Sequence, residues 1–192
     1  LGGAAPPPAS FKLKAAIDAR DKINPNCKII ARTDAFSAAG EKRDKHLGGD
    51  ADEAVKRLTA YADAGADYLW CEFPSPDPES ALVVSERVKK VHPRICFAFN
   101  ISPSFSKENW DNSSLSEWLL NEMGYKLRFA TYPAILSAMR EVFNSALEFK
   151  RQGAVSGMCH LKAGVNGTPA ESVMKVVNVD RYLENERKYV PT

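Results

Sequence analysis

The sequence predicts an α/β fold in which parallel strands alternate with helices. Four short apolar runs of the kind that form buried strands recur at intervals of about 30 residues, and segments with helical spacing separate them. Polar residues also follow each apolar run directly, as expected where functional groups gather at the carboxyl ends of parallel strands. This periodicity fits a small doubly wound sheet as well as half of a (β/α)8 barrel.

The first unit begins with a helix from Ser10, a favourable N-cap residue, which we expect to end at Asn24-Pro25-Asn26. The following run Lys28–Ala31 is β-branched at its centre and bounded by turn residues, which is typical of a buried strand. After a charged loop, apolar residues at helical spacing predict a helix over residues 51–62, and Gly65 is a candidate for its C-terminal cap.

The same pattern then repeats. Residues 67–71 form the second predicted strand, and Pro78 starts a third helix that His92-Pro93 ends. Residues 95–99 form the third predicted strand. Sequence order therefore gives strand, helix and strand again, which is the arrangement of parallel βαβ units.

The fourth unit is marked by Ser114 and Glu117, which match a capping box and predict a helix that ends near Gly124. The fourth predicted strand covers residues 126–130. An apolar stripe beyond Pro133 then predicts a long helix that ends near residue 153.

The C-terminal segment has a different character. It contains glycines and is expected to be helical around 169–177 and 179–188, with no strand of its own. We therefore predict two parts, a set of βα units over 1–153 and a helical arm over 154–192. An arm without strands suggests that the arm is exchanged between subunits.

Composition narrows the classes of function. Apolar residues make up 44% of the 192 residues and charged residues 26%, which is typical of soluble globular proteins. The net charge of +2 is too small to indicate a basic surface that binds nucleic acid or a membrane, and no apolar run could span a bilayer. Four widely spaced cysteines without metal-ligand spacing favour a reduced compartment. We expect a soluble protein of the cytoplasm or an organelle matrix, with neither nucleic acid nor membrane as partner.

The residues at the four strand ends suggest a ligand. Arginine presents planar, bidentate donors to carboxylates, and hydroxyl or amide groups can bind a second carboxylate without adding charge. These types of side chain predict a site for a small di- or tricarboxylate. The candidates are Arg32, Glu72, Asn100, Ser102, Ser104 and Thr131.

Spacing alone leaves structural interpretations open for these candidates. Arg32 is two residues from Asp34, so a local ion pair at a strand end is an equally good interpretation. Glu72 fits a salt bridge to a neighbouring strand, and the segment 100–105 fits a capped turn. No glycine-rich phosphate loop is present, so a nucleotide cofactor has no support.

Four motifs in order resemble those of the isocitrate lyase family, in the superfamily that also holds 2-methylisocitrate lyase and phosphoenolpyruvate mutase. The family motifs are I-A-R-T-D-A, W-x-E, Y-N-C-S-P-S-F and F-I-T. In this chain they correspond to Ile30–Ala35, Trp70–Glu72, Phe99–Phe105 and Phe129–Thr131, and Leu1-Gly2-Gly3 is similar to the L-G-G that follows the family's K-K-C-G-H loop.

This resemblance implies a fold and a starting point. The chain is expected to be the C-terminal half of a (β/α)8 barrel, strands 5 to 8, with a helical C-terminal arm. It would begin just after the loop that carries the catalytic cysteine. Such a half exposes unpaired strand edges, so we expect it to be inactive alone and to need the N-terminal half.

The resemblance also implies a reaction, the cleavage of isocitrate to glyoxylate and succinate in the glyoxylate cycle. Arg32 and Glu72 would be catalytic, and a Mg²⁺ ion would be held by ligands in the N-terminal half, so that no metal ligand lies in this chain. A homotetramer is expected. The residues expected to bind substrate are Leu1, Gly2, Arg32, Asn100, Ser102, Ser104 and Thr131.

Departures from the family pattern keep alternatives open. Ile101 stands where the lyase has cysteine, and residues 106–109 interrupt the step from S-F to N-W. Tyr132-Pro133 and Glu72-Phe73-Pro74 lean toward 2-methylisocitrate lyase, which gives pyruvate and succinate. An alternative of another class is a non-catalytic scaffold or truncated subunit.

Overall fold

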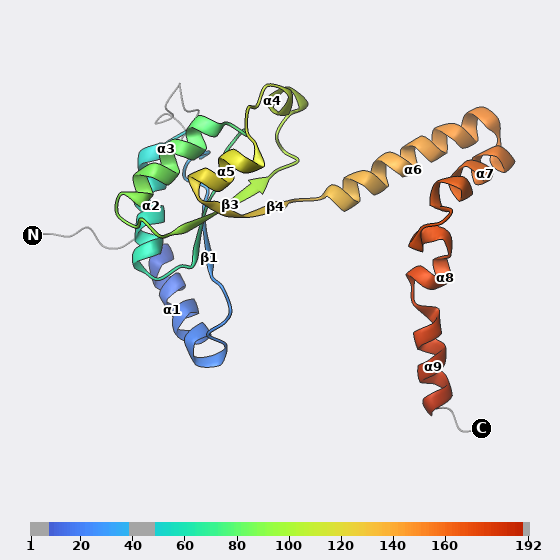
Figure 1. The fold of residues 1–192 in the computed structure, drawn as a ribbon, viewed down its shortest axis with the longest axis horizontal. Helices are drawn as coiled ribbons and strands as arrows, with labels where there is room; N and C mark the ends of the chain where they lie inside the picture. The colour runs from blue at the N-terminus through green and yellow to red at the C-terminus, as the bar shows by residue number, and fades with distance from the viewer. Residues whose placement is uncertain (1–7, 39–48, 190–192) are drawn as a thin grey trace, which may run out of the picture. The chain divides into compact units, whose positions relative to one another are not determined.

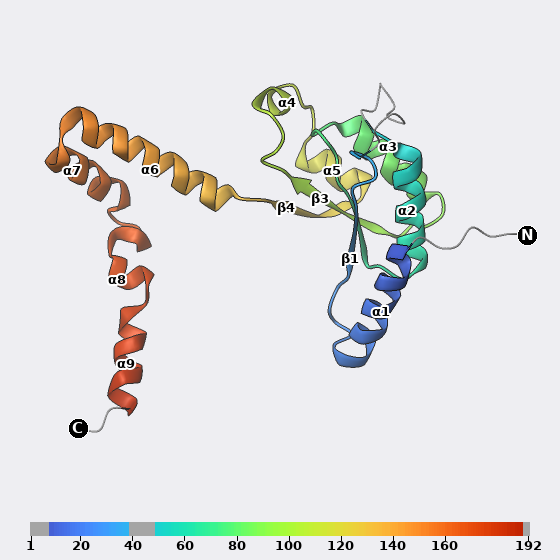
Figure 2. The same ribbon diagram turned by 180° about the vertical axis from the view of Figure 1, so that it is seen from behind.

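The computed structural model describes residues 8–38 and 49–189 of the chain. It divides into two compact units, Leu1–Thr131 and Tyr132–Thr192, which we call unit 1 and unit 2 (Figures 1 and 2). Each unit is described by itself below. The predicted division into 1–153 and 154–192 stays a prediction.

Unit 1 is built on a sheet of four parallel strands: β1 (Ile30–Thr33), β2 (Tyr68–Cys71), β3 (Cys96–Ile101) and β4 (Tyr125–Ala130). Their spatial order is the sequence order β1-β2-β3-β4. A doubly wound sheet would contain a point where the strand order reverses. The observed order has none, so it matches an arc of a barrel, and the predicted α/β fold with parallel strands is confirmed.

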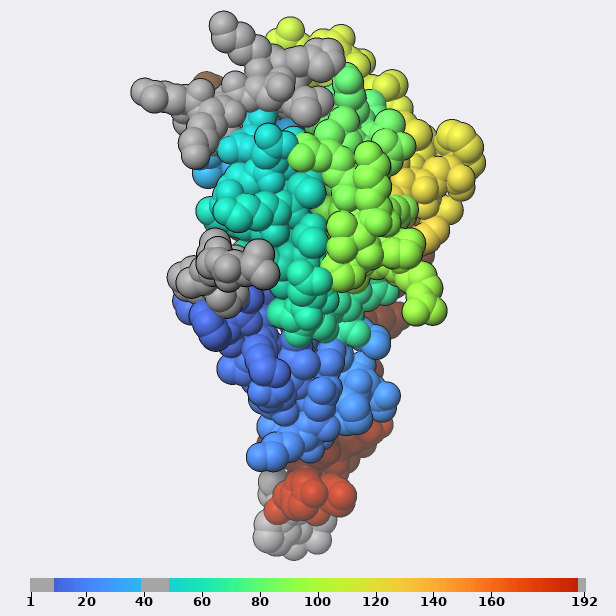
Figure 3. Space-filling model, turned by 90° about the vertical axis from the view of Figure 1, so that its left-hand side faces the viewer, coloured from blue at the N-terminus to red at the C-terminus, as the bar shows by residue number. Residues whose placement is uncertain are grey.

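The described residues of unit 1 form five helices: α1 (Pro8–Ile23), α2 (Ala51–Asp63), α3 (Pro78–Lys89), α4 (Lys107–Asp111) and α5 (Glu117–Met123). Two of them, α2 and α3, lie side by side and form the outer layer seen in Figure 3. Because α2 contacts β1 and β2 while α5 contacts β4, the helices cover one face of the sheet along its whole width.

Side chains at the helix starts explain where the helices begin. The Asp50 carboxylate accepts from the backbone N–H of Glu53 at 2.9 Å, which caps α2. The Asp77 carboxylate accepts from the N–H of Ser80 at 2.9 Å, and Pro78 occupies the first turn of α3, where no N–H is needed. Both starts agree with the sequence prediction.

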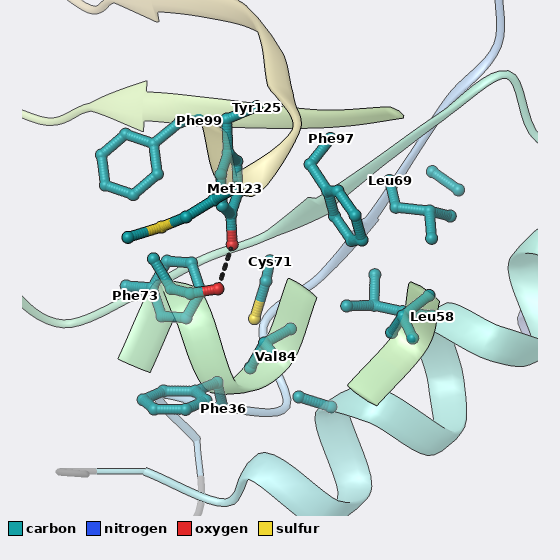
Figure 4. Close-up of a cluster of buried hydrophobic side chains, with 14 of the residues drawn as sticks. Phe36, Leu58, Leu69, Cys71, Phe73, Val84, Phe97, Phe99, Met123 and Tyr125 are labelled. Atoms are coloured by element: carbon teal, nitrogen blue, oxygen red, sulfur yellow. Dashed lines mark hydrogen bonds between the residues drawn. The ribbon is translucent and has the colours of Figure 1, made fainter. Parts of the chain in front are cut away.

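The core fills the space between the sheet and these helices (Figure 4). Phe97, Phe99 and Tyr125 of β3 and β4 are fully buried or nearly so, and the Tyr125 hydroxyl donates to the Ala81 backbone oxygen at 3.0 Å. Burial raises the pKa of Tyr125 and that of the Cys71 thiol, so both stay protonated. Cys71 is therefore an inert core residue.

The opposite face of the sheet carries the alternate residues of each strand. Ile30 is 41% exposed although it lies in a strand, and Trp70 is only partly buried. Among the described residues of unit 1, no helix packs on this face. Parallel sheets normally have both faces covered, and this face is open over the described residues of unit 1.

Unit 2 is entirely helical over its described residues: α6 (Pro133–Gln152), α7 (Ala154–Val165), the short 3-10 helix η2 (Pro169–Glu171), α8 (Val173–Val176) and α9 (Val179–Tyr189). The sequence predicted α6 and α9 closely but not α7. None of the described helices in either unit is long and apolar enough to cross a membrane.

Several predicted boundaries differ from the structure. Helix α1 already includes Pro8, so Ser10 lies inside its first turn and is not its N-cap. The first strand begins at Ile30, not at Lys28, because the backbone N–H of Ile29 donates a hydrogen bond to the Asp67 carboxylate at 2.9 Å and not to a neighbouring strand. Helix α5 is capped by Ser116, whose hydroxyl accepts from the N–H of Leu119, so the capping box predicted at Ser114 was wrong. A short helix, α4, also lies before it and was not predicted.

Candidate functional site

The predicted site residues fall into two groups. Leu1 and Gly2 lie outside the described residues. The others lie in the last residues of the four strands of unit 1 or shortly after them, at the carboxyl end of the sheet, which is where ligands bind to parallel sheets. They are Arg32, Glu72, Asn100, Ser102, Ser104 and Thr131.

Arg32 connects the first two strand ends. Its position alternates with the buried residues Ala31 and Thr33, so its side chain leaves the sheet on the face without helices. The Arg32 Nε donates to Asp34 Oδ1 at 2.7 Å, and Nη2 lies 3.7 Å from Glu72 Oε2. The local ion pair with Asp34 is therefore present, but Arg32 also faces the carboxylate of the next strand.

Polar contacts continue from Glu72 to the last strand. Asn100 Nδ2 donates to Glu72 Oε1 at 3.4 Å, and Thr131 Oγ1 donates to Asn100 Oδ1 at 3.4 Å. Together with the Arg32 pairs, these contacts make one continuous row across all four strand ends, which we call the polar row and which consists of Asp34, Arg32, Glu72, Asn100 and Thr131.

The contacts in the second half of the polar row are long. A distance of 3.4 Å between donor and acceptor is beyond the usual range of protein hydrogen bonds, so each contact contributes little. A ligand oxygen could replace either contact at low cost. Glu72 Oε2 is in addition buried without a hydrogen-bond partner among the described residues, which marks the centre of the row as incompletely satisfied.

Ser102 and Ser104 lie beside the polar row in the segment after β3. Their hydroxyl oxygens are 2.6 Å apart, and the Ser104 N–H donates to Ser102 Oγ at 3.2 Å. Ser102 is 6% exposed, whereas Ser104 is exposed. The segment is a capped turn, as the structural interpretation expected, and it also presents one hydroxyl to solvent.

A cavity of about 490 Å³ adjoins the Arg32 end of the polar row. Its wall carries both signs of charge, and the hydrogen bond from Arg57 lowers the pKa of Glu53 despite some desolvation. Asn100, Ser104 and Thr131 do not line it. The described residues therefore form a row along the sheet edge, and no single cavity holds them all. The lining residues are Arg32, Thr33, Asp34, Ala35, Ala38, Asp50, Glu53, Arg57 and Tyr61.

The fit of a metal ion can be tested on the side chains. Over the described part of the chain, no group of three or more His, Cys, Asp or Glu side chains lies together as a metal site requires. Asp34 and Glu72 also both face Arg32, which competes for their oxygens. These residues do not form a magnesium site by themselves.

Sequence reasoning gave Trp70 no role in the site, yet it lies within it. The Arg32 guanidinium carbon is 4.2 Å from the centroid of the Trp70 ring, and the indole Nε1 is buried without a hydrogen-bond partner among the described residues. The alternation of side chains along a strand could have placed Trp70 in the site, because Trp70 is two residues before Glu72 and so lies on the same face of the sheet.

Comparisons with known proteins agree with this geometry. The family model described as "Phosphoenolpyruvate phosphomutase" matches residues 5–143. Isocitrate lyase of Haloferax volcanii is 33% identical over 184 residues, which cover 95% of this chain and 50% of that protein. Isocitrate lyase of Salmonella typhimurium is 32% identical over 158 residues, which cover 70% of this chain and 36% of that protein. The chain thus spans about half, or less, of the length of these curated relatives.

Solved structures share the fold. Phosphoenolpyruvate phosphomutase from Streptomyces platensis subsp. rosaceus matches with a TM-score of 0.65 and 24% identity, over 98% of this chain and 56% of that one. A 2,3-dimethylmalate lyase, titled a member of the PEP mutase/isocitrate lyase superfamily, matches with a TM-score of 0.61 and 22% identity, over 94% of this chain and 54% of that one. At these identities the matches concern the fold alone.

Proposed function

The chain belongs to the phosphoenolpyruvate phosphomutase family, in the superfamily that includes isocitrate lyase, and we propose that it supplies half of the active site of a carbon–carbon lyase. The other half would come from further βα units that cover the open face of the sheet. The observation that carries this proposal is the polar row, which joins an arginine, a carboxylate, an amide and a hydroxyl across four strand ends.

The proposed substrate is isocitrate, which the enzyme would cleave to glyoxylate and succinate. In this retro-aldol reaction the 2-hydroxyl group loses its proton and becomes the glyoxylate carbonyl as the bond between carbons 2 and 3 breaks. The electron pair passes to carbon 3 and into its carboxylate, and a proton then completes succinate. The groups that need stabilising are therefore carboxylates whose charge grows during the reaction.

The polar row suits this demand. The Arg32 guanidinium donates to Asp34 through Nε, and Nη2 is 3.7 Å from Glu72, so its outer end, formed by the two Nη groups, would bind one substrate carboxylate in a bidentate way. Asn100 Nδ2 and the hydroxyl groups of Ser104 and Thr131 supply neutral donors for another carboxylate. Neutral donors hold an anion without fixing it so tightly that product release becomes slow.

The net charge of the polar row supports the proposal that the other half of the site contributes positive charge. Arg32 carries one positive charge and faces the two carboxylates of Asp34 and Glu72, so these three groups sum to one negative charge. A tricarboxylate would be repelled unless the covering half brings positive charge. The magnesium ion that the family resemblance implies would supply it, with ligands outside the described residues.

The test is product analysis with the protein isolated in its native assembly. We expect glyoxylate and succinate from isocitrate, measured by chromatography of both products. A second candidate, 2-methylisocitrate, is favoured by Tyr132-Pro133 and Glu72-Phe73-Pro74 and would give pyruvate instead of glyoxylate. Dominant pyruvate release would replace isocitrate by this substrate. No cleavage of either compound would favour a non-catalytic scaffold and overturn the lyase proposal.

A further inference from the structure

We propose that Trp70 is a positioning residue that holds the Arg32 guanidinium through the face of its indole ring. This inference rests on the proposed function, because it assigns the orientation of the arginine that would bind substrate carboxylate. It starts from one contact, the 4.2 Å separation between the Arg32 guanidinium carbon and the centroid of the Trp70 ring. At that distance the cation is attracted to the π-system of the ring.

The strand register makes this contact specific. Arg32 on β1 and Trp70 on β2 are paired residues of adjacent parallel strands, so their side chains leave the same face of the sheet side by side. The Asp34 carboxylate holds the Nε of the guanidinium, and the Glu72 carboxylate lies near Nη2. Trp70 supplies the remaining restraint, since it supports the plane of the guanidinium that neither carboxylate touches.

Trp70 is itself held by a second aromatic contact. Its ring centroid is 4.8 Å from that of Phe129, with an interplanar angle of 85°, which is a favourable edge-to-face geometry. Phe129 lies on β4, so the two rings meet across β3. An aromatic pair can span an intervening strand only where that strand presents a small side chain.

Ala98 meets this requirement. It is paired with Trp70 in the register of β2 and β3 and is 0% exposed, although it is absent from the core cluster beneath the helices. Its neighbours Phe97 and Phe99 belong to that cluster, so Ala98 faces the opposite side of the sheet. The burial of Ala98 on that face is what Trp70 and Phe129 lying over it would produce.

This arrangement separates two roles of Trp70. The indole face acts on Arg32, whereas the indole N–H is buried without a partner among the described residues. Phenylalanine keeps an aromatic face and removes the N–H, and leucine removes both. The pair of substitutions therefore distinguishes a ring that positions the arginine from an N–H that serves another group.

The kinetic experiment compares Trp70→Phe and Trp70→Leu in the native assembly. We expect Trp70→Leu to lower kcat/KM by about three- to thirtyfold, mainly through a higher KM, because the arginine loses its support. Trp70→Phe should retain most of the wild-type value. Trp118→Leu is the matched control, since Trp118 is 71% exposed on α5, and it should leave kinetics unchanged. Equal losses in Trp70→Phe and Trp70→Leu, or no loss in either, would overturn the proposal.

A spectroscopic experiment tests the contact without relying on lyase activity. The chain has three tryptophans, and a Trp110→Phe/Trp118→Phe variant keeps only Trp70. The fluorescence emission of this variant reports on the surroundings of the Trp70 ring. We expect Arg32→Met to shift or intensify that emission, while Lys14→Met on the surface of α1 should not. Unchanged Trp70 emission after Arg32→Met would contradict the stacked contact. Absence of lyase activity with a clear emission change would instead remove the proposed function and leave the contact standing.

Discussion

The hydroxyl oxygens of Ser102 and Ser104 lie 2.6 Å apart at the carboxyl end of β3, one buried and the other exposed. Two hydroxyl protons are available, and one is used in the bond between the two groups. Ser102 Oγ accepts the Ser104 N–H, and either hydroxyl can donate to the other; we assign the donor role to Ser102, because its buried hydroxyl has no solvent to donate to. The Ser104 proton then remains free for a ligand.

This donor arrangement predicts unequal effects of two alanine substitutions. Ser104→Ala should lower kcat/KM of the native assembly about tenfold or more, because a hydrogen bond to a charged carboxylate is lost. Ser102→Ala should lower it less and should instead reduce thermal stability, because the Ser104 N–H loses its acceptor. Steady-state kinetics and thermal unfolding of both variants provide the measurement. A larger kinetic loss in Ser102→Ala, without a change in stability, would reverse the assigned roles.

A second prediction concerns the charge and shape of Arg32. Lysine keeps the charge but has no planar fork, so Arg32→Lys should lower kcat/KM by at least about tenfold while the assembly stays intact. Kinetics together with size-exclusion chromatography provide the measurement. Arg57→Lys is the matched control, because Arg57 borders the neighbouring cavity but is outside the polar row. If Arg32→Lys and its control had equal kinetics, Arg32 would not bind substrate.

A third prediction concerns pH and Asp67, which ties α1 and β1 to β2. Desolvation opposes ionisation of this carboxyl, but the Ile29 N–H and the Lys28 and Arg20 cations outweigh it, so its pKa is lowered. A lowered folded-state pKa contributes stability above the unfolded value of about 3.9, and this contribution is lost as pH falls through the folded value.

Asp67→Asn should therefore destabilise the protein by about 1 kcal/mol at neutral pH, and the difference from wild type should vanish in acid. Thermal unfolding between neutral and acidic pH measures it. Asp18→Asn is the control, since Asp18 makes only an exposed i,i+4 pair with Lys14 and should matter little. A difference that persisted below the folded pKa would mean that shape, and not charge, underlies the effect.

A fourth prediction concerns the packing of α6 against α7 in unit 2. A Cβ atom added at Gly157 would lie 2.5 Å from the Phe149 ring, whereas one added at Gly164 would meet nothing within 4 Å. Both glycines are in α7, so alanine raises helix propensity equally at each. Gly164→Ala should stabilise the protein by up to about 1 kcal/mol, and Gly157→Ala should cost about 1–3 kcal/mol relative to it. Equal urea midpoints for the two variants would contradict this packing.

Much of unit 1 could be predicted because its signals are local. The apolar runs, the start of α3 at Pro78 and the end of α5 near Gly124 depend on neighbouring residues alone, and each predicted strand exists within a few residues of its expected place. The true start of β1 could not be predicted, because it depends on a contact between Asp67 and Ile29 across 38 positions in the sequence. Helix α7 was missed for a related reason, since Gly157 and Gly164 weaken helix propensity, and the close approach of Phe149 to Gly157 appears only in the fold.

The sequence predicted which residues belong to the site, but not which of their side chains contact each other. Strand ends pointed to Arg32, Glu72, Asn100 and Thr131, yet sequence spacing does not say which side chains meet. The link from Arg32 to the Trp70 ring requires the register between β1 and β2, which only the folded sheet provides. The difference in burial between Ser102 and Ser104 likewise appears only in the folded structure.

The position of succinate in an experimental structure of the native assembly tests the proposed site most directly. We expect one succinate carboxylate within hydrogen-bonding distance of Asn100 Nδ2, Ser104 Oγ and Thr131 Oγ1, on the face of the sheet opposite α2 and α3. Succinate bound away from these three groups, or a polar row covered by protein with no room for a carboxylate, would contradict it.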